Sequence, residues 1–371
     1  MLFLKPLLSR FLFFCLIIIA LPTYAQDSTA RWPEKKAWDW YNKQPWYCGF
    51  NYVPAYAINY TAMWDKTTFD SAAIDKELTL AQKPGMNVLR AVLQFAVYED
   101  DPAYFLKTLD AFMRVCDRHK IKFVPALFDD CVFGITHDPQ VGRQPQPLVG
   151  WYAWAWSPSP GHSLVVDSTT HPRIEKYVKA VIGRFKNDQR ILFWDLYNEP
   201  TNGGLGAASF PLLKKVIGWA RTVNPSQPLS VDVWNNDKRL NDIVLAASDV
   251  ITFHNYGNKE ELTKQINNLK QYNRPLICTE WMNRPNGSTI ATNLEVFYNE
   301  KVGCMLWGLV NGKTQTDLPW GHRPGDPAPQ IWQHDLYRSD FTTYNPVEIE
   351  TIKKYVSESK SAAGNKTKNG K

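Results

Sequence analysis

The sequence predicts an α/β protein that folds as a single (β/α)8 TIM barrel with long loops after its third and eighth strands. Short apolar segments alternate with amphipathic segments along most of the chain, and eight such pairs can be counted. Continuous apolar strands separated by helices indicate a parallel sheet that is covered on both faces. An open doubly wound sheet usually carries a glycine-rich phosphate turn after its first strand, and Gly49-Phe50-Asn51-Tyr52 is not such a turn. Eight strand–helix units close into a barrel.

Each predicted strand is a short apolar run, and a segment with helical periodicity follows it. The strands are expected at residues 49–53, 87–93, 122–128, 191–197, 229–234, 250–254, 275–280 and 303–309. The helices are expected at residues 69–82, 102–120, 172–185, 210–223, 240–247, 259–272, 293–301 and 346–357. Pro84-Gly85 follows the first of these helices and is a typical stop signal.

Two connections are far longer than the usual two to six residues. One runs from residue 129 to about residue 171, and the other runs from residue 311 to about residue 345. Both leave the C-terminal ends of predicted strands and are rich in Trp, Pro and Gly. Active sites of such barrels form at this end, so the two loops are expected to shape the site.

The N-terminus has the features of a secretory signal peptide. Lys5 and Arg10 precede an apolar run over residues 11–21, and Thr23-Tyr24-Ala25 supplies small residues for cleavage after Ala25. Residues 1–25 are therefore predicted to be a signal peptide, with an uncleaved anchor as the alternative. We expect a secreted, periplasmic or cell-surface protein without a membrane span after cleavage.

The mature chain is expected to be one folded domain over residues 26–357, with a disordered basic tail over residues 358–371. The formal net charge of the whole chain is +6, and the leader and the tail carry much of it. Charge placed in this way does not indicate a nucleic-acid-binding surface. We expect a monomer.

The cysteines indicate neither a disulfide framework nor a zinc module, because five remain after leader removal and no Cys-x-x-Cys pair occurs. Cys278 and Cys304 lie in apolar runs and are predicted to be buried. An oxidising compartment would permit a disulfide between Cys48 and Cys131, which the sequence does not decide.

Two predicted strands end on a glutamate. The run Ile-Leu-Phe-Trp-Asp-Leu-Tyr-Asn-Glu-Pro over residues 191–200 places Glu199 at a strand tip, where proline stops the ladder. Residues 275–281, Pro-Leu-Ile-Cys-Thr-Glu-Trp, end in the same way on Glu280. These are strands four and seven, whose tips face each other across the mouth of a closed barrel. Retaining glycosidases need such a pair, one carboxyl to protonate the leaving oxygen and one to attack the anomeric carbon. Either glutamate taken alone would be read as an ion-paired loop residue.

The segments Asn198-Glu199-Pro200 and Thr279-Glu280-Trp281 resemble the catalytic motifs of the clan A glycoside hydrolases, most closely those of the family 5 cellulase/mannanase-like group. The resemblance extends over essentially the whole mature chain. It implies a retaining hydrolase of β-glycosidic bonds that works by double displacement, with Glu199 as acid/base and Glu280 as nucleophile. Asn198 resembles the family asparagine that binds the sugar 2-hydroxyl.

Four further substrate-binding positions follow from the same resemblance. Arg90 resembles the arginine beside the nucleophile, where a fixed cation favours the carboxylate form, and an ordinary salt bridge is the plainer interpretation. His254 and Tyr256 resemble the family His-x-Tyr, in which the tyrosine orients the nucleophile, although His254 could be a core histidine. Trp307 resembles the tryptophan platform under the −1 sugar, and core packing is its alternative.

The match to the family is incomplete at strand three, where many relatives place a histidine and this chain reads Phe128-Asp129-Asp130. Those aspartates either bind sugar hydroxyls or cap the following turn. Asp195 is expected to face the barrel lumen in a supporting role. Five loop tryptophans are left open between sugar binding and loop packing, namely Trp151, Trp154, Trp156, Trp320 and Trp332.

Several other classes are disfavoured. No His-x-His pair supports a metal-dependent barrel hydrolase, and no Gly-x-Ser-x-Gly motif supports a serine hydrolase. The expected chemistry needs no cofactor and no metal. A transglycosylase and a non-catalytic carbohydrate-binding barrel remain the alternatives, and retention of both glutamates argues against the second. The resemblance implies a β-linked glucan, mannan or xylan as substrate. The two long loops could wall one end of the cleft and favour exo-action or short oligosaccharides.

Overall fold

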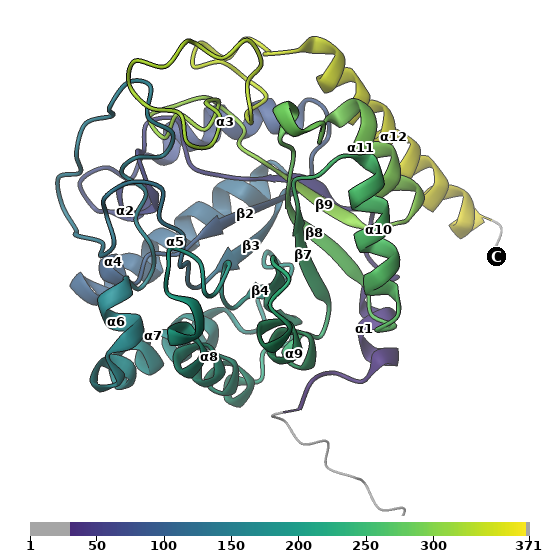
Figure 1. The fold of residues 1–371 in the computed structure, drawn as a ribbon. Coiled ribbons are helices and arrows are strands. Elements are labelled where there is room, and N and C mark those ends of the chain that lie inside the picture. Colours follow the sequence, from purple (N-terminus) through teal and green to yellow (C-terminus); the bar gives the residue numbers. More distant parts are fainter. Residues whose placement is uncertain (1–29, 369–371) are drawn as a thin grey trace, which may run out of the picture.

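The computed structural model describes residues 30–368, and its centre is a parallel β-sheet rolled into a barrel inside a ring of helices (Figure 1). The strand order is β5-β4-β3-β2-β1-β9-β8-β7-β6. The strands are β1 (Cys48–Asn51), β2 (Val88–Val92), β3 (Lys122–Ala126), β4 (Trp194–Asp195), β5 (Leu229–Ser230), β6 (Asp232–Val233), β7 (Ile251–Asn255), β8 (Leu276–Trp281) and β9 (Gly303–Trp307).

The barrel closes through β5 and β6, which are the two halves of the predicted fifth strand. β5 pairs with β4, and β6 pairs with β7, so the chain changes partner at Val231. Backbone hydrogen bonds hold both sides of this junction, from Leu196 N to Ser230 O at 2.8 Å and from Asp249 N to Leu229 O at 2.8 Å. The nine short strands therefore correspond to the eight predicted ones, and the predicted (β/α)8 barrel is confirmed.

All eight predicted helices are present, with ends that differ by a few residues for most of them. They are α3 (Ser71–Gln82), α5 (Pro102–Arg118), α7 (His171–Phe185), α8 (Phe210–Val223), α9 (Lys238–Ala247), α10 (Lys259–Lys270), α11 (Ile290–Asn299) and α12 (Pro346–Lys368). Four further short helices are α1 (Glu34–Tyr41), α2 (Tyr60–Trp64), α4 (Phe95–Asp100) and α6 (His162–Val166). Local capping fixes several starts, as where the Asn258 side chain accepts from Glu261 N and completes a capping box for α10.

Apolar side chains fill the N-terminal end of the barrel and leave its C-terminal end to polar groups. The buried cluster there includes Val88, Val124, Ile277 and Met305, each from a different strand. Trp40 and Tyr41 of α1 pack against this cluster, and the Tyr41 hydroxyl donates to Lys301 O at 2.7 Å. Helix α1 therefore covers the closed end, and the polar lumen faces the other way.

Helix α12 extends past residue 357, the predicted end of the folded domain, and runs to Lys368. The sequence left open whether Cys48 and Cys131 form a disulfide. Cys48 and Cys131 are both free and buried. Cys48 opens β1 beside Cys304, whereas Cys131 lies at the opposite, C-terminal end of the barrel, too far away for a disulfide.

The predicted signal peptide, residues 1–25, lies outside the described residues. Within residues 30–368, no helix is both long enough and apolar enough to cross a membrane.

Candidate active site

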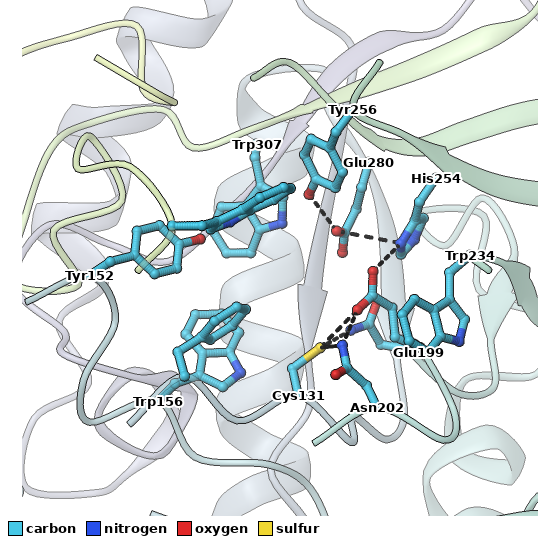
Figure 2. A pocket seen from close by; sticks show the side chains of 13 residues that line it. Cys131, Tyr152, Trp156, Glu199, Asn202, Trp234, His254, Tyr256, Glu280 and Trp307 are labelled. Carbon is cyan, nitrogen blue, oxygen red and sulfur yellow. Dashed lines mark hydrogen bonds and ion pairs between the residues drawn. The ribbon is translucent and has the colours of Figure 1, made fainter. Parts of the chain in front are cut away.

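A pocket of about 290 Å³ opens at the C-terminal ends of the strands, and six of the seven predicted site residues line it (Figure 2). Its polar lining consists of Cys131, Asn198, Glu199, Asn202, His254 and Glu280. Its aromatic lining consists of Phe133, Tyr152, Trp156, Trp234, Tyr256, Trp307 and Trp320. Arg90, the seventh predicted residue, is 1% exposed and reaches the pocket through Glu280. A few convergent polar groups inside an aromatic cavity are typical of a ligand site.

Glu280 lies near the C-terminal end of β8, where two register shifts re-aim the side chains. The pairing with β7 shifts between Phe253 and His254, which places His254 opposite Glu280. Glu280 Oε2 accepts from the Tyr256 hydroxyl at 2.6 Å, and Oε1 accepts from Arg90 Nη1 at 2.7 Å. Both oxygens of this buried carboxylate are therefore held by donors.

Arg90 ties together four strands inside the lumen. Its guanidinium donates to Asn51 of β1 at 2.9 Å, to Asp195 of β4 at 2.7 Å and to Glu280 of β8 at 2.7 Å. It also donates to Asn198 Oδ1 at 2.6 Å. Burial opposes its charge, but the carboxylates of Asp195 and Glu280 raise the pKa of Arg90 well above its ordinary value. Asp195 does face the lumen, where it neutralises and orients this cation.

Glu199 follows β4 in a strained backbone conformation, with a φ of +41°. Left-handed conformations of residues other than glycine cost roughly 1–3 kcal/mol and persist only where surrounding contacts enforce them. Here the backbone N–H of Glu199 donates to Asp232 Oδ1 at 3.1 Å, and Pro200 follows. The side-chain Oε2 accepts from Asn202 Nδ2 at 2.5 Å and from Cys131 Sγ at 3.2 Å. The strain therefore aims the carboxyl into the pocket.

His254 stands between the two glutamates. Its Nδ1 lies 2.8 Å from Glu199 Oε1 and 3.5 Å from Glu280 Oε2. Burial lowers the pKa of His254, but the charges of Glu280, Asp232 and Glu199 outweigh it and raise that pKa to about 9. Burial likewise raises the pKa of Glu199, but the hydrogen bond and the charge of His254 leave it below its ordinary value. At neutral pH these two shifts place the proton on His254 and leave Glu199 as a carboxylate.

The two aspartates after β3 are fully buried and do not line the pocket. Asp129 accepts from Asn198 Nδ2 at 2.8 Å and from Trp156 Nε1 at 2.8 Å. Asp130 accepts from the Tyr197 hydroxyl at 2.7 Å. Asp129 also accepts from Cys131 N at 2.9 Å and so caps the turn that follows it. Of the two alternatives that the sequence left open, the structure therefore favours the turn cap for Asp129, and neither aspartate faces the pocket.

Two of the five loop tryptophans, Trp156 and Trp320, line the pocket together with Trp307. Trp307 is 7% exposed, and its ring lies 5.5 Å from that of Trp156 and 6.0 Å from that of His334. The other three loop tryptophans, Trp151, Trp154 and Trp332, do not line the pocket.

The sequence over residues 53–313 matches the family model described as Cellulase (glycosyl hydrolase family 5). The chain belongs to glycosyl hydrolase family 5. It is therefore a glycosidase, and the matched region contains both glutamates of the pocket. No curated protein matches the sequence.

Solved structures share the fold of this family 5 enzyme at low sequence identity. An exo-β-1,4-mannosidase from Opitutaceae bacterium strain TAV5 superposes with a TM-score of 0.59 at 16% identity, over 85% of this chain and 60% of that one. An endo-β-1,4-mannanase from Thermotoga petrophila gives 0.55 at 14% identity, over 86% and 78%. A broad-specificity endoglucanase from Clostridium longisporum gives 0.55 at 10% identity, over 87% and 98%. The chain thus spans less than two thirds of the length of the exo-mannosidase.

Within residues 30–368, ligand-type atoms of Glu199, His254 and Glu280 lie within 4.8 Å of one another, which is close enough to hold a metal ion. The surroundings of the three groups oppose that use. Arg90 already neutralises Glu280 at 2.7 Å, and the raised pKa of His254 keeps protonated the nitrogen that would have to bind the metal.

Sequence reasoning missed several residues of this family 5 site. Asn202 and Cys131 bind the Glu199 carboxyl, and Tyr152 and Trp234 border the cavity, all from connections between elements. Such positions carry no periodic signal. The sequence did offer a signal for Asp232. This carboxylate lies inside the apolar run Leu-Ser-Val-Asp-Val-Trp, and a buried carboxylate is unusual unless it has a partner.

Proposed function

We propose that this family 5 enzyme hydrolyses β-glycosidic bonds with retention of anomeric configuration, with Glu280 as nucleophile and Glu199 as acid/base. The observation that carries the proposal is the closeness of the two carboxyls, whose facing oxygens lie within 4.8 Å of each other. Retaining enzymes hold their two carboxyls about 5–5.5 Å apart, whereas inverting enzymes need about 6.5–9.5 Å to admit a water molecule.

In the first step Glu280 attacks the anomeric carbon and forms an ester to the sugar. The bond from that carbon to the glycosidic oxygen breaks, and Glu199 gives its proton to the departing oxygen. Arg90 and Tyr256 hold Glu280 in position for the attack, since each donates to one of its oxygens. The proton that Glu199 gives is supplied by His254 Nδ1, which lies 2.8 Å from Glu199 Oε1.

In the second step Glu199, now a carboxylate, takes a proton from water, and the resulting hydroxide attacks the anomeric carbon and releases Glu280. Asn198 is placed to bind a sugar hydroxyl during both steps. Its Oδ1 accepts from Arg90, and one N–H of its amide donates to Asp129. The second N–H meets only the Cys131 sulfur, a weak acceptor, at 3.4 Å at the pocket wall, so a sugar hydroxyl can take its place.

The substrate class that we propose is a β-linked hexose glycan of the mannan or glucan type, with xylan as a less favoured alternative. Support comes from the family and from the names of similar structures, which include a mannosidase, a mannanase and an endoglucanase. We also propose that the enzyme is secreted. N-terminal sequencing of the exported protein should then begin at Gln26.

Hydrolysis of a panel of β-linked polysaccharides and aryl β-glycosides, by wild type beside Glu280→Ala, tests the proposal. Activity on one member should vanish in this variant and persist in Glu300→Ala, a matched change on a helix end that does not line the pocket. NMR of the first product anomer should show retention. Azide should rescue Glu199→Ala on activated substrates as a β-glycosyl azide. An inverted product anomer would refute the mechanism.

A further inference from the structure

The two long loops touch each other above the barrel and form one continuous wall. In the first loop, residues 129–161, the backbone N–H of Ala153 donates to Thr314 O of the second loop at 2.9 Å. Gln315 of the second loop accepts from Gly150 N at 2.9 Å and donates to Leu148 O at 2.8 Å. Gln315 holds a φ of +55°, a strained conformation that these cross-loop hydrogen bonds support.

The connection after β1 forms hydrogen bonds with both loops. Asn59 Nδ2 donates to Ala155 O at 2.8 Å, and Lys313 N donates to Ala55 O at 3.0 Å. Gly312 approaches this connection so closely that a Cβ at its position would lie 2.4 Å from Ala55 Cα. The loops after β1, β3 and β9 therefore form one packed layer over one side of the barrel mouth.

This layer places buried aromatic rings at one end of the pocket. Tyr152 and Trp156 line the cavity while only 4% and 2% exposed. Behind Trp156 the ring of Tyr60, itself 1% exposed, packs edge-on at 5.0 Å. Trp156 is also fixed by its hydrogen bond to Asp129 at 2.8 Å. A sugar ring cannot continue past this end without displacing a double layer of packed aromatics.

The other side of the mouth carries short connections. Residues 234–237 join β6 to α9, and residues 256–258 join β7 to α10. Figure 2 shows Trp234 and Asn202 on the Glu199 side of the pocket, across from Tyr152 and Trp156. Trp234 and Asn202 are only partly buried. A chain can therefore leave the pocket past Glu199 but cannot leave it past the aromatic wall.

The proposed chemistry determines which way the substrate chain runs between these two ends of the pocket. The sugar that Glu280 attacks occupies the enclosed end over Trp307, and the leaving group that Glu199 protonates extends past Glu199. Resting on the proposed function, we infer that the enzyme acts on the non-reducing ends of β-linked chains and releases one sugar at a time, because the loop wall removes any site beyond the attacked residue. A cavity of 290 Å³ suits this, since it lies at the lower limit of ligand pockets, which span roughly 300–1,000 Å³.

The test uses β-1,4-linked gluco-, manno- and xylo-hexaoses reduced to alditols at their reducing ends. The first products from the active member should be a free monosaccharide and an alditol chain shorter by one unit. A matched hexaose with a methyl group on O4 of its non-reducing sugar should react roughly 10- to 100-fold more slowly, because the added methyl overpacks the closed end.

The possible outcomes distinguish failure of the exo inference from failure of the proposed function. Alditol products of several lengths in the first minutes, or equal rates on blocked and free hexaoses, would overturn the exo inference. If that internal cleavage disappears in Glu280→Ala, the proposed function stands and only the exo inference fails. If no hexaose and no aryl glycoside is cleaved in a Glu280-dependent way, both fail together.

A loop variant links the product pattern to the wall. Gln315→Gly relieves the positive φ but removes the hydrogen bonds to the first loop, and it should lower kcat/KM for an aryl monoglycoside by about tenfold. It should also increase cleavage of the blocked hexaose relative to the free one. Lys120→Gly is the control, because Lys120 has a φ of 58° at the end of α5 and does not line the pocket. An unchanged ratio of blocked to free hexaose cleavage in a folded Gln315→Gly enzyme would contradict the inference that the loop wall closes this end of the pocket.

Discussion

Replacing Tyr256 by Phe removes a single oxygen from the pocket and should lower kcat/KM by roughly 10- to 150-fold. The magnitude follows from the hydrogen bond of 2.6 Å between the tyrosine hydroxyl and Glu280 Oε2. A hydrogen bond to a charged group contributes about 1.5–3 kcal/mol, and each 1.4 kcal/mol corresponds to about tenfold. Arg90 still holds the other oxygen, so the variant should fold and keep part of its activity.

The assay is kcat/KM on the aryl glycoside that the panel identifies. Tyr337→Phe is the matched control, because it loses a buried hydrogen bond to Leu80 O at 3.0 Å outside the pocket. It should lower the melting temperature and leave kcat/KM unchanged. A Tyr256→Phe enzyme with kcat/KM within twofold of wild type would refute the reasoning.

Three further predictions concern the proton and the charge of the site. Because folding raises the pKa of His254 from 6.5 to about 9, its contribution to stability is complete below pH 6.5 and is lost as the pH rises through 9. Thermal melts should show this loss, up to about 3 kcal/mol, and His254→Gln should show a smaller one. Cys131→Ala should move the alkaline limb of the kcat/KM profile to higher pH, because the thiol at 3.2 Å helps keep the pKa of Glu199 low, while Cys131→Ser should not. EDTA should leave turnover unchanged. A loss of turnover that only added metal restores would show that a metal ion, and not Arg90 alone, supplies the positive charge beside Glu280.

The repeated strand–helix pattern was enough to predict the barrel, but it did not predict where the hydrogen-bonded pairing between strands is interrupted. The predicted strand over residues 191–197 keeps only Trp194 and Asp195 as a ladder, with isolated bridges at Ile191 and Asn198. The fifth strand divides at Val231, where it changes neighbours. Both are consequences of closing the sheet on itself. The short helices α2, α4 and α6 were missed because five or six residues are too few to show a period.

The site was predictable where it depends on strand ends and not where it depends on loops. Glu199, Glu280 and His254 could be placed because each ends or follows an apolar run, and strand tips converge at one end of a parallel barrel. Asn202 and Tyr152 reach the pocket only through the folding of irregular connections. Their positions depend on contacts between segments that lie far apart in the sequence.

The bridging of strands by Arg90 has a consequence for how activity arises during folding. Its partners come from β1, β4 and β8, so Asp195 can pair with the guanidinium within the first half, whereas the bond to Glu280 forms only when the first and last parts of the sheet have met. A fragment containing only the first half of the barrel would carry Glu199 and the Arg90–Asp195 pair without Glu280. On the proposed mechanism such a fragment is inactive, and turnover by two separately produced halves would report their correct reassembly.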